Sequence, residues 1–430
     1  MMTQNYNWSR NVTEKVLVAL SDTPVILVNG ARQTGKSTLV EAIAATRHPA
    51  HYVSFDNYNV LLAAKESPLA FVDQAHGEAL AIDEVQLFPE VFRAVKIAVD
   101  QNRQSGQFIL TGSTNVLLLS KASEFLADRM EIMTLWPLSQ GELGGVKEGF
   151  IDQVFSEGNL NFDEVSHLSL EKLYSVLLTG GYPEVNTRPT LSRQKDWFRS
   201  YLTSIMQRDI KELAQIEKAV QFPSIMSLIG TRAGSLLNMS EISRTSGLAN
   251  TTLKRYLALL EALYLLVRVP AWSRNASKSL VRSPKAYITD TGLYCFLNNL
   301  DEQRLEKERG LLGALVENFI AMELMKQQGW SEIRTSLYHY RTRAGQEVDF
   351  VLQADNGMLV GIEVKSKAAL AHADFKGLRH MQESYGDQFH RGIVLYMGDQ
   401  TLPFGPNLHA VPMSALWELG ARPAYNIFTE

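Results

Sequence analysis

A glycine-rich segment near the N-terminus constrains the fold of this chain more than any other feature. Residues 24–29 (PVILVN) are apolar and rich in β-branched side chains, which predicts a buried strand. Residues 30–37 follow directly, read GARQTGKS and have the spacing G-x-x-x-x-G-K-[ST]; residues 38–45 then have a helical pattern. Strand, glycine loop and helix in this order direct backbone N–H groups and the positive end of a helix dipole at an anion. The segment therefore predicts a phosphate-binding loop rather than a chance turn.

The loop carries the side chains that a nucleoside triphosphate and its metal ion need. We expect the Lys36 ammonium to reach the β- and γ-phosphates and the Ser37 hydroxyl to bind Mg²⁺. The predicted cofactors are therefore ATP and Mg²⁺. The other loop and helix positions that we assign to nucleotide binding are Gly30, Ala31, Arg32, Gln33, Thr34, Gly35 and Thr38.

Two further apolar runs end in polar residues. Residues 78–84 (EALAIDE) end in Asp83 and Glu84, and residues 107–110 (QFIL) are followed by Thr-Gly and Ser113. Each end alone could be an ordinary solvated strand terminus, but the carboxyl ends of parallel strands meet at one edge of a sheet. We expect Asp83 to hold the Mg²⁺ shell, Glu84 to act as general base toward water, and Ser113 to sense the γ-phosphate.

The ordered set of motifs resembles the AAA-type ATPases found at the head of bacterial and archaeal proteins with a C-terminal DUF4143 region. Its N-terminal segments are GARQTGKS, LAIDEVQ, ILTGS and ADRMEIMTLWPLSQGE. Downstream it continues in GGYPE (180–184), QRDI (207–210) and SPKAYITDTGL (283–293), so it covers nearly the whole chain. Ala31 stands where the family often has Pro, and Ser37 where it often has Thr. Neither departure removes a phosphate or Mg²⁺ contact.

Arg129 lies in the last of the N-terminal segments. We assign it a contact with the γ-phosphate, either in its own chain or across a subunit boundary. The alternative is an ordinary surface charge.

Charge is distributed unevenly along the middle of the chain. The whole chain has 42 Lys+Arg and 46 Asp+Glu, a net charge of −4, which excludes a uniformly basic nucleic-acid binder. Residues 142–171 contain seven acids and one base, and we expect them to form a solvated connector between domains. Residues 239–285 contain eight bases and two acids.

The basic segment has the pattern of a winged helix-turn-helix. We expect a helix over residues 240–246, a turn at Gly247, a second helix over 251–262 with Asn250 as its N-cap, and an extended stretch at 265–271. Leucines at 253, 257 and 260 would face the core. Interdomain packing is the alternative to entry of the second helix into a DNA groove. The outward residues that we assign to nucleic acid are Thr251, Thr252, Lys254 and Arg255.

The C-terminal third combines acids with a lysine. Residues 313–326 read as an amphipathic helix carrying Glu317, and residues 355–357 (DNG) predict a hairpin turn. A hairpin centred on residue 356 pairs residue i with 712 − i, so Asp349 lies opposite Glu363, with Lys365 on the same face. Carboxylates that hold Mg²⁺ beside an ammonium suit metal-dependent phosphodiester cleavage.

This group resembles the PD-(D/E)xK nuclease superfamily. The resemblance implies that Glu317, Asp349 and Glu363 bind the metal and that Asp349, Glu363 and Lys365 are catalytic. Val348 replaces the usual Pro before Asp349. A solvated hairpin, or a fold that binds nucleic acid without cutting it, is the alternative.

These predictions describe an α/β multidomain chain. Its parts are an AAA-type P-loop ATPase with a parallel sheet (1–150), a helical connector (151–235), a winged helix (236–300) and a PD-(D/E)xK-like α/β domain (301–430). We expect Mg²⁺-dependent ATP hydrolysis coupled to action on DNA. The alternative is a nucleotide-switched protein-interaction module with a non-catalytic C-terminal fold. No membrane span or secretory signal is visible, so the expected location is cytoplasmic, and a homo-oligomer is left open.

Overall fold

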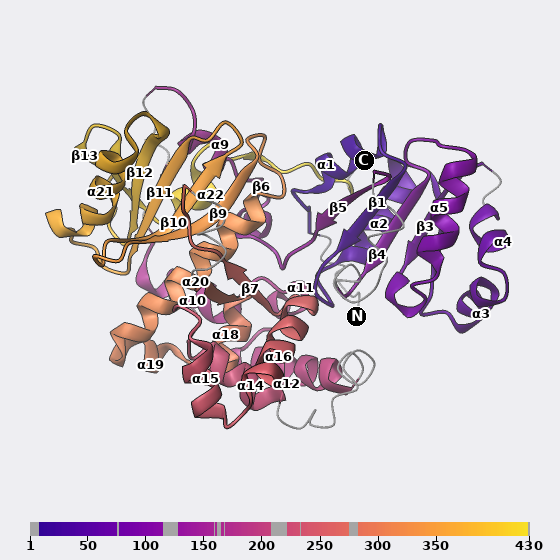
Figure 1. Cartoon of the computed structure of the whole chain (residues 1–430), viewed down its shortest axis with the longest axis horizontal. Coiled ribbons are helices and arrows are strands. Elements are labelled where there is room, and N and C mark those ends of the chain that lie inside the picture. Colours follow the sequence, from indigo (N-terminus) through magenta and orange to yellow (C-terminus); the bar gives the residue numbers. More distant parts are fainter. Residues whose placement is uncertain are drawn as a thin grey trace.

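The computed structural model describes residues 8–74, 77–114, 128–158, 160, 165–166, 168–207, 222–232, 234–274 and 283–428. Its N-terminal part contains a five-stranded parallel sheet of order β2-β3-β4-β1-β5 (Figure 1). The strands are β1 Val25–Asn29, β2 Ala50–Ser54, β3 Ala79–Asp83, β4 Phe108–Gly112 and β5 Met130–Thr134. The expected mixed α/β class with an N-terminal parallel sheet is confirmed.

Helices cover both faces of this sheet, and two hydrophobic clusters lie on its opposite sides. Strand β1 is buried along its whole length, which explains why its sequence is continuously apolar rather than alternating. The helices of this part are α1 Thr13–Leu20, α2 Lys36–Thr46, α3 Tyr58–Glu66, α4 Pro68–Asp73 and α5 Val91–Gln101.

The segment after the sheet is packed rather than solvated. It forms α8 Gln140–Gly144, β6 Val146–Lys147 and α9 Phe150–Val154, and the apolar residues of α9 are fully buried. Glu142 and Glu148 are each only 2% exposed. The prediction of a solvated acidic connector is therefore wrong for Glu142 and Glu148, whose carboxylates bind Arg10, Asn11 and a backbone N–H, whereas Glu157 and Glu171 are exposed as predicted. The acids at 163 and 164 lie outside the described residues.

The middle part is mainly helical. The helices are α10 Leu170–Thr179, α11 Pro183–Asn186, α12 Leu191–Gln207, α14 Phe222–Gly230, α15 Met239–Ser246 and α16 Asn250–Ala262, followed by the antiparallel pair β7 Leu266–Val269 and β8 Lys285–Ile288. Gly247 ends α15 in the left-handed conformation, and Leu253, Leu257 and Leu260 are buried as expected. Asn250 is the first helical residue of α16 and Ala249 occupies the N-cap, so the predicted cap is wrong by one residue. Residues 208–210 of the QRDI motif and the bases Lys278 and Arg282 lie outside the described residues.

The C-terminal part is built on a mixed six-stranded sheet of order β13-β14-β12-β11-β10-β9. Its strands are β9 Thr335–Arg341, β10 Glu347–Ala354, β11 Leu359–Lys365, β12 Phe389–Tyr396, β13 Leu402–Gly405 and β14 Leu408–Pro412. Helices α18 Thr291–Leu297, α19 Glu302–Lys307 and α20 Arg309–Gln327 precede the sheet, and α21 Lys376–Tyr385 and α22 Ala415–Glu418 are the later helices. Phe350 pairs with Ile362 and Leu352 with Val360, which is the register predicted for the hairpin.

The three parts share hydrophobic cores instead of forming independently packed domains. Leu257 of α16, Phe319 of α20 and Ile362 of β11 belong to one hydrophobic cluster that joins the middle and C-terminal parts. Near the other end of the chain, Ile427 is buried in a cluster with Val16 and Val28 of the N-terminal part, and the C-terminal end lies beside α1 and β1 in Figure 1. The limits proposed at residues 235 and 300 thus do not separate independent cores. None of the described helices is long and apolar enough to cross a membrane.

The packing of Ile427 can be tested by truncating its side chain. Ile427→Ala is expected to lower the free energy of unfolding by about 2–5 kcal/mol, because it leaves a cavity in the N-terminal core. Chemical denaturation followed by tryptophan fluorescence measures this loss. Leu69→Ala, at a half-exposed apolar residue of α4, is the control and is expected to cost under about 1 kcal/mol. Equal losses in the two variants would contradict the packing described.

Candidate functional sites

The phosphate loop has the backbone geometry that its glycines allow. The loop joins β1 to α2, and Gly30 (φ +146°) and Gly35 (φ +93°) lie in conformations that other residues rarely adopt. A Cβ on Gly30 would also collide with the carbonyl oxygen of Leu135. Helix α2 begins at Lys36 directly after Gly35, so its free N–H groups face the loop.

Lys36 extends across the loop. Its side chain is buried, and the ammonium donates to the carbonyl oxygen of Ala31 at 2.7 Å. Burial lowers the pKa of Lys36 to about 8, although the carboxylates of Glu84 and Asp83 act in the opposite direction. The ammonium is therefore mostly charged at neutral pH and is held by a single carbonyl, which phosphate oxygens can replace.

Asp83 is surrounded by hydroxyl groups. Ser37 Oγ lies 3.0 Å from both carboxylate oxygens, Thr111 donates to Oδ1, and Ser54 Oγ lies 3.4 Å from Oδ2. A serine hydroxyl beside a carboxylate fits a Mg²⁺ ion that takes its other ligands from phosphate and water. The structure thus brings together the two residues that the sequence assigned to the metal.

Glu84 is held at the end of β3 by an unusual backbone and two neighbours. Its φ of 59° is left-handed, and its N–H donates to Thr111 Oγ1 at 3.1 Å. Ser113 Oγ lies 3.1 Å from Glu84 Oε2, and the amide of Gln86 donates both to Glu84 and to Ser113. Ser113 therefore contacts the predicted general base. Gln86 was not predicted, although its place in the LAIDEVQ segment was a usable signal.

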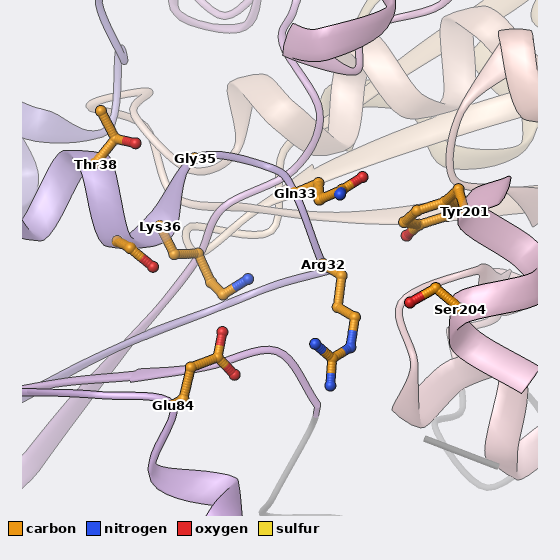
Figure 2. Close-up of a pocket in the computed structure, with 9 residues that line it drawn as sticks. Arg32, Gln33, Gly35, Lys36, Thr38, Glu84, Tyr201 and Ser204 are labelled. Carbon is orange, nitrogen blue, oxygen red and sulfur yellow. The ribbon is translucent and has the colours of Figure 1, made fainter. Parts of the chain in front are cut away.

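Lys36, Ser37 and Glu84 line one cavity of about 310 Å³, with Asp83, Gln86 and Ser113 behind its lining. Figure 2 shows the Lys36 ammonium and the Glu84 carboxylate facing the same space, with Tyr201 and Ser204 on its other side. The two latter residues come from α12 in the middle part, and no local spacing could have predicted them. The lining is Arg32, Gln33, Gly35, Lys36, Ser37, Thr38, Glu84, Tyr201 and Ser204. Of the remaining loop positions assigned to the nucleotide, Gly30, Ala31 and Thr34 shape the loop from outside this lining.

A second cavity of about 580 Å³ adjoins the first and shares Gln33, Gly35, Thr38, Tyr201 and Ser204 with it. Its outer wall is formed by the GGYPE segment, the turn after α11, and α12, through Pro183, Glu184, Arg188, Trp197 and Ser200. Tyr201 is fixed there by a 2.9 Å hydroxyl contact with Tyr182 and by stacking on Trp197. The middle part therefore forms one wall of the candidate nucleotide site.

Arg129 lies far from this cavity. It precedes β5, at the edge where the parallel strands begin, and its carbonyl accepts from the N–H of Val25 at the start of β1. Five strand residues at about 3.3 Å each separate that edge from the phosphate loop. The Arg129 side chain instead pairs with Asp100 at 2.6 Å. The predicted contact with a γ-phosphate in its own chain is therefore a misassignment.

A buried arginine that the sequence did not indicate supports the loop from behind. Arg10 is 6% exposed and donates to the carbonyl oxygen of Thr34 at 2.6 Å, to that of Trp136 at 2.7 Å and to Glu142 at 3.1 Å. Thr34 directly precedes Gly35 and Lys36. By fixing the Thr34 carbonyl on the outer side of the loop, Arg10 keeps the following N–H groups directed at the phosphate position.

The C-terminal hairpin also brings its predicted residues together. Asp349 Oδ2 accepts from the N–H of Val364 at 2.9 Å, and Lys365 Nζ lies 2.5 Å from Glu363 Oε1. Burial and the charge of Asp349 raise the pKa of Glu363 to about 8 and that of Glu317 to about 7. All four residues thus lie at one site.

The same site contains an unpredicted cation. Lys285 Nζ, from β8, lies 2.9 Å from Glu317 and 3.5 Å from Asp349. In the part of the chain that the structure describes, no three acidic, His or Cys side chains are arranged to hold a metal ion. Glu317 and Asp349 are instead each paired with the Lys285 ammonium.

The residues assigned to nucleic acid lie at the start of α16. Thr251, Lys254 and Arg255 are exposed, Thr252 is half-buried, and Leu253 between them is buried. The predicted division of this helix into an inner and an outer face is thus present.

Comparison with known sequences agrees with the N-terminal geometry. The sequence model of a family described as "AAA domain" matches residues 22–144. Models for domains of unknown function match residues 170–304 (DUF8612) and 312–416 (DUF4143). The N-terminal part is an AAA domain, and the C-terminal part is a DUF4143 region. Residues 180–293, whose motifs the sequence resemblance grouped with DUF4143, are matched by the separate DUF8612 model.

Similar proteins share this arrangement over most of their length. Proteins named only as uncharacterized in Mycobacterium tuberculosis and Mycobacterium bovis are each 27% identical over 414 residues, covering 96% of this chain and 85% of their own. One from Haemophilus influenzae is 23% identical over 395 residues, covering 86% of this chain and 89% of its own. The AAA domain therefore occurs joined to the same downstream parts in distant bacteria.

The role of Arg10 can be tested with a substitution that keeps its charge. Arg10→Lys retains a cation but cannot make all three contacts, so we expect ATP binding to weaken roughly tenfold or more, as for the loss of a charged hydrogen bond. Titration with a fluorescent ATP analogue measures this change. Arg47→Lys, which affects an arginine stacked on Tyr425 away from the loop, is the control. Equal affinities in both variants would show that Arg10 does not position the loop.

Proposed function

We propose that this protein binds ATP together with Mg²⁺ and hydrolyses it at the carboxyl edge of the AAA-domain sheet. One observation carries the proposal: the Lys36 ammonium, the Ser37–Asp83 pair and the Glu84 carboxylate converge on a single cavity beside the phosphate loop. These are the groups that phosphoryl transfer to water requires, namely charge on the phosphates, a metal position and a base for water.

Each residue has a separate role in this proposal. Lys36 leaves the Ala31 carbonyl and binds the β- and γ-phosphate oxygens. Bound Mg²⁺, held by Ser37 and Asp83, would neutralise phosphate charge. Glu84 orients water and accepts its proton, while Ser113 and Gln86 hold its carboxylate toward the cavity.

ATP in this cavity would contact two parts of the chain. Tyr201 and Ser204 of α12 form its far wall, so a bound nucleotide bridges the AAA domain and the DUF8612 part. Occupancy of the site would thereby bias how these parts pack. This supports a protein whose ATP state is communicated to its downstream regions.

A second proposal concerns the partner of the middle part. We infer that α14, α15, α16 and the β7–β8 pair form a winged helix-turn-helix that contacts DNA through Lys254 and Arg255. Its support is the exposed polar face at the start of α16. The basic surface is smaller than the sequence count indicates, because Arg268 pairs with Glu261 and Lys285 is buried among acids.

The base assignment is tested by Glu84→Gln. We expect turnover of ATP to fall at least about a hundredfold, because a general base contributes that much or more, while the dissociation constant for ATP changes less than about threefold. Lys36→Ala is expected to lose ATP binding itself. Steady-state phosphate release and nucleotide titration measure the two effects, with Glu90→Gln at an exposed acid of the same domain as the control. Wild-type turnover in Glu84→Gln would remove Glu84 from the mechanism.

The DNA proposal is tested by salt dependence. Removal of one phosphate-binding cation is expected to reduce the slope of log affinity against log salt by about 1, so the Lys254→Ala, Arg255→Ala double variant should reduce it by roughly 2. Fluorescence anisotropy with a labelled duplex between about 50 and 200 mM salt gives the slopes. Lys65→Ala, at an exposed lysine of α3, is expected to leave the slope unchanged. If wild-type protein binds no duplex at the lowest salt, the DNA contact is wrong and the middle part serves interdomain packing.

A further inference from the structure

The acids at the C-terminal sheet surround a cation that belongs to the chain itself. Lys285 Nζ lies 2.9 Å from Glu317 Oε1 on α20, 3.1 Å from Glu347 Oε1 and 3.5 Å from Asp349 Oδ1, both on β10. The ammonium has three N–H donors; it donates a hydrogen bond to Glu317 and forms ion pairs with Glu347 and Asp349. Lys285 therefore has as many acidic partners as it has protons to donate.

The contact is buried. The Lys285 side chain is 4% exposed, and those of Glu317 and Asp349 are 17% and 15% exposed. Tyr287, two residues along β8 on the same face, donates from its hydroxyl to Glu317 Oε1 at 2.8 Å. Burial lowers the pKa of Lys285, but the carboxylates, led by Glu317, outweigh it and hold the pKa above its ordinary value. Because burying a charge without a partner is costly, the ammonium and the acids depend on one another.

Asp349 and Glu363 have further contacts, although Glu363 Oε2 is buried without a hydrogen-bond partner among the described residues. Asp349 Oδ2 accepts from the backbone N–H of Val364, and Glu363 Oε1 is paired with the Lys365 ammonium. A divalent ion between Glu317 and Asp349 would have to displace the buried Lys285 ammonium from both of them and leave it with Glu347 alone.

We propose that the acid cluster of Glu317, Glu347 and Asp349 binds the Lys285 ammonium instead of a metal ion for phosphodiester cleavage. This contact joins β8 of the middle part to the C-terminal sheet. The proposal does not depend on ATP hydrolysis at the N-terminal site. It favours a C-terminal fold that serves as a platform for the middle part over one that acts as a nuclease.

The pairing has a geometric consequence for the middle part. Strand β8 pairs with β7, and β7 follows directly from α16. Lys285 also forms a β-bridge with Leu236, just before α15. Fixing Lys285 on the C-terminal sheet therefore fixes the direction in which the exposed face of α16 points.

The first test compares metal binding by the full-length wild-type protein and Asp349→Asn in the absence of nucleotide. Mn²⁺ binding is followed by electron paramagnetic resonance, and cleavage of single- and double-stranded DNA is assayed with Mn²⁺. We expect Asp349→Asn to change neither the amount of bound Mn²⁺ nor the rate of DNA cleavage relative to the wild-type protein. Stoichiometric Mn²⁺ binding, or cleavage, that Asp349→Asn abolishes and Lys36→Ala retains would overturn the proposal and support the nuclease.

The second test removes the ammonium. Lys285→Met is expected to lower the thermal midpoint by several degrees more than Lys367→Met, whose lysine pairs with Asp374 and is half exposed. Adding Glu317→Gln to Lys285→Met should recover part of that loss, because the acid left without its partner is removed. If the fall in thermal midpoint of the double variant equals the sum of the falls in Lys285→Met and Glu317→Gln alone, the two side chains are not coupled.

A milder variant keeps the test usable if Lys285→Met does not fold. Glu347→Gln removes one carboxylate at the more exposed rim of the cluster. It is expected to increase hydrogen exchange at β8 residues relative to those of β7, measured by mass spectrometry on the full chain. Unchanged exchange at β8 would contradict a role of the cluster in holding this strand.

Discussion

The placement of the AAA domain relative to the rest of the chain depends on buried charged and polar groups that bind one another. Arg10 links the Thr34 carbonyl of the phosphate loop to Glu142, while Asn11 and the N–H of Gly141 bind Glu148. On α20, Glu323 accepts from the N–H of Gln140, and Lys326 donates both to Glu323 and to the carbonyl of Leu138. Burial raises the pKa of Glu148 to about 8. Water cannot replace these partners in the interior, so the loop, α8 and α20 are positioned together.

The sequence was most informative where a site depends on local spacing. The phosphate loop, the acids at the end of β3 and the hairpin register follow from intervals of a few residues, and the structure has each of them. Arg10, Tyr201 and Lys285 could not be predicted, because each acts on residues far away in the chain. Glu142 and Glu148 were wrongly predicted to be solvated for the same reason: Arg10 and Asn11, which bind their buried carboxylates, lie more than 130 residues earlier in the chain.

The two lysine-containing sites differ in what a ligand would have to displace. Lys36 donates to a single backbone carbonyl, and the cavity beside it leaves room for an anion. Lys285 is surrounded by three carboxylates and is almost fully buried. Replacing the partners of the lysine by a ligand therefore costs little free energy at the first site and much more at the second. A lysine near carboxylates thus forms a candidate ligand-binding site at Lys36 and a structural contact between two parts of the chain at Lys285.

The return of the chain to its N-terminal domain has a consequence for synthesis. Ile427 completes a cluster with Val16 and Val28, about 400 residues earlier. A ribosome adding about 5–20 residues per second needs roughly 20 to 80 s to bridge that interval. From the synthesis of β5 (Met130–Thr134) until the end of that time, the nascent AAA domain exposes the apolar surface that Ile427 will cover. The topology therefore places its demand on the nascent chain, which must keep this surface free of other contacts until Ile427 has been made.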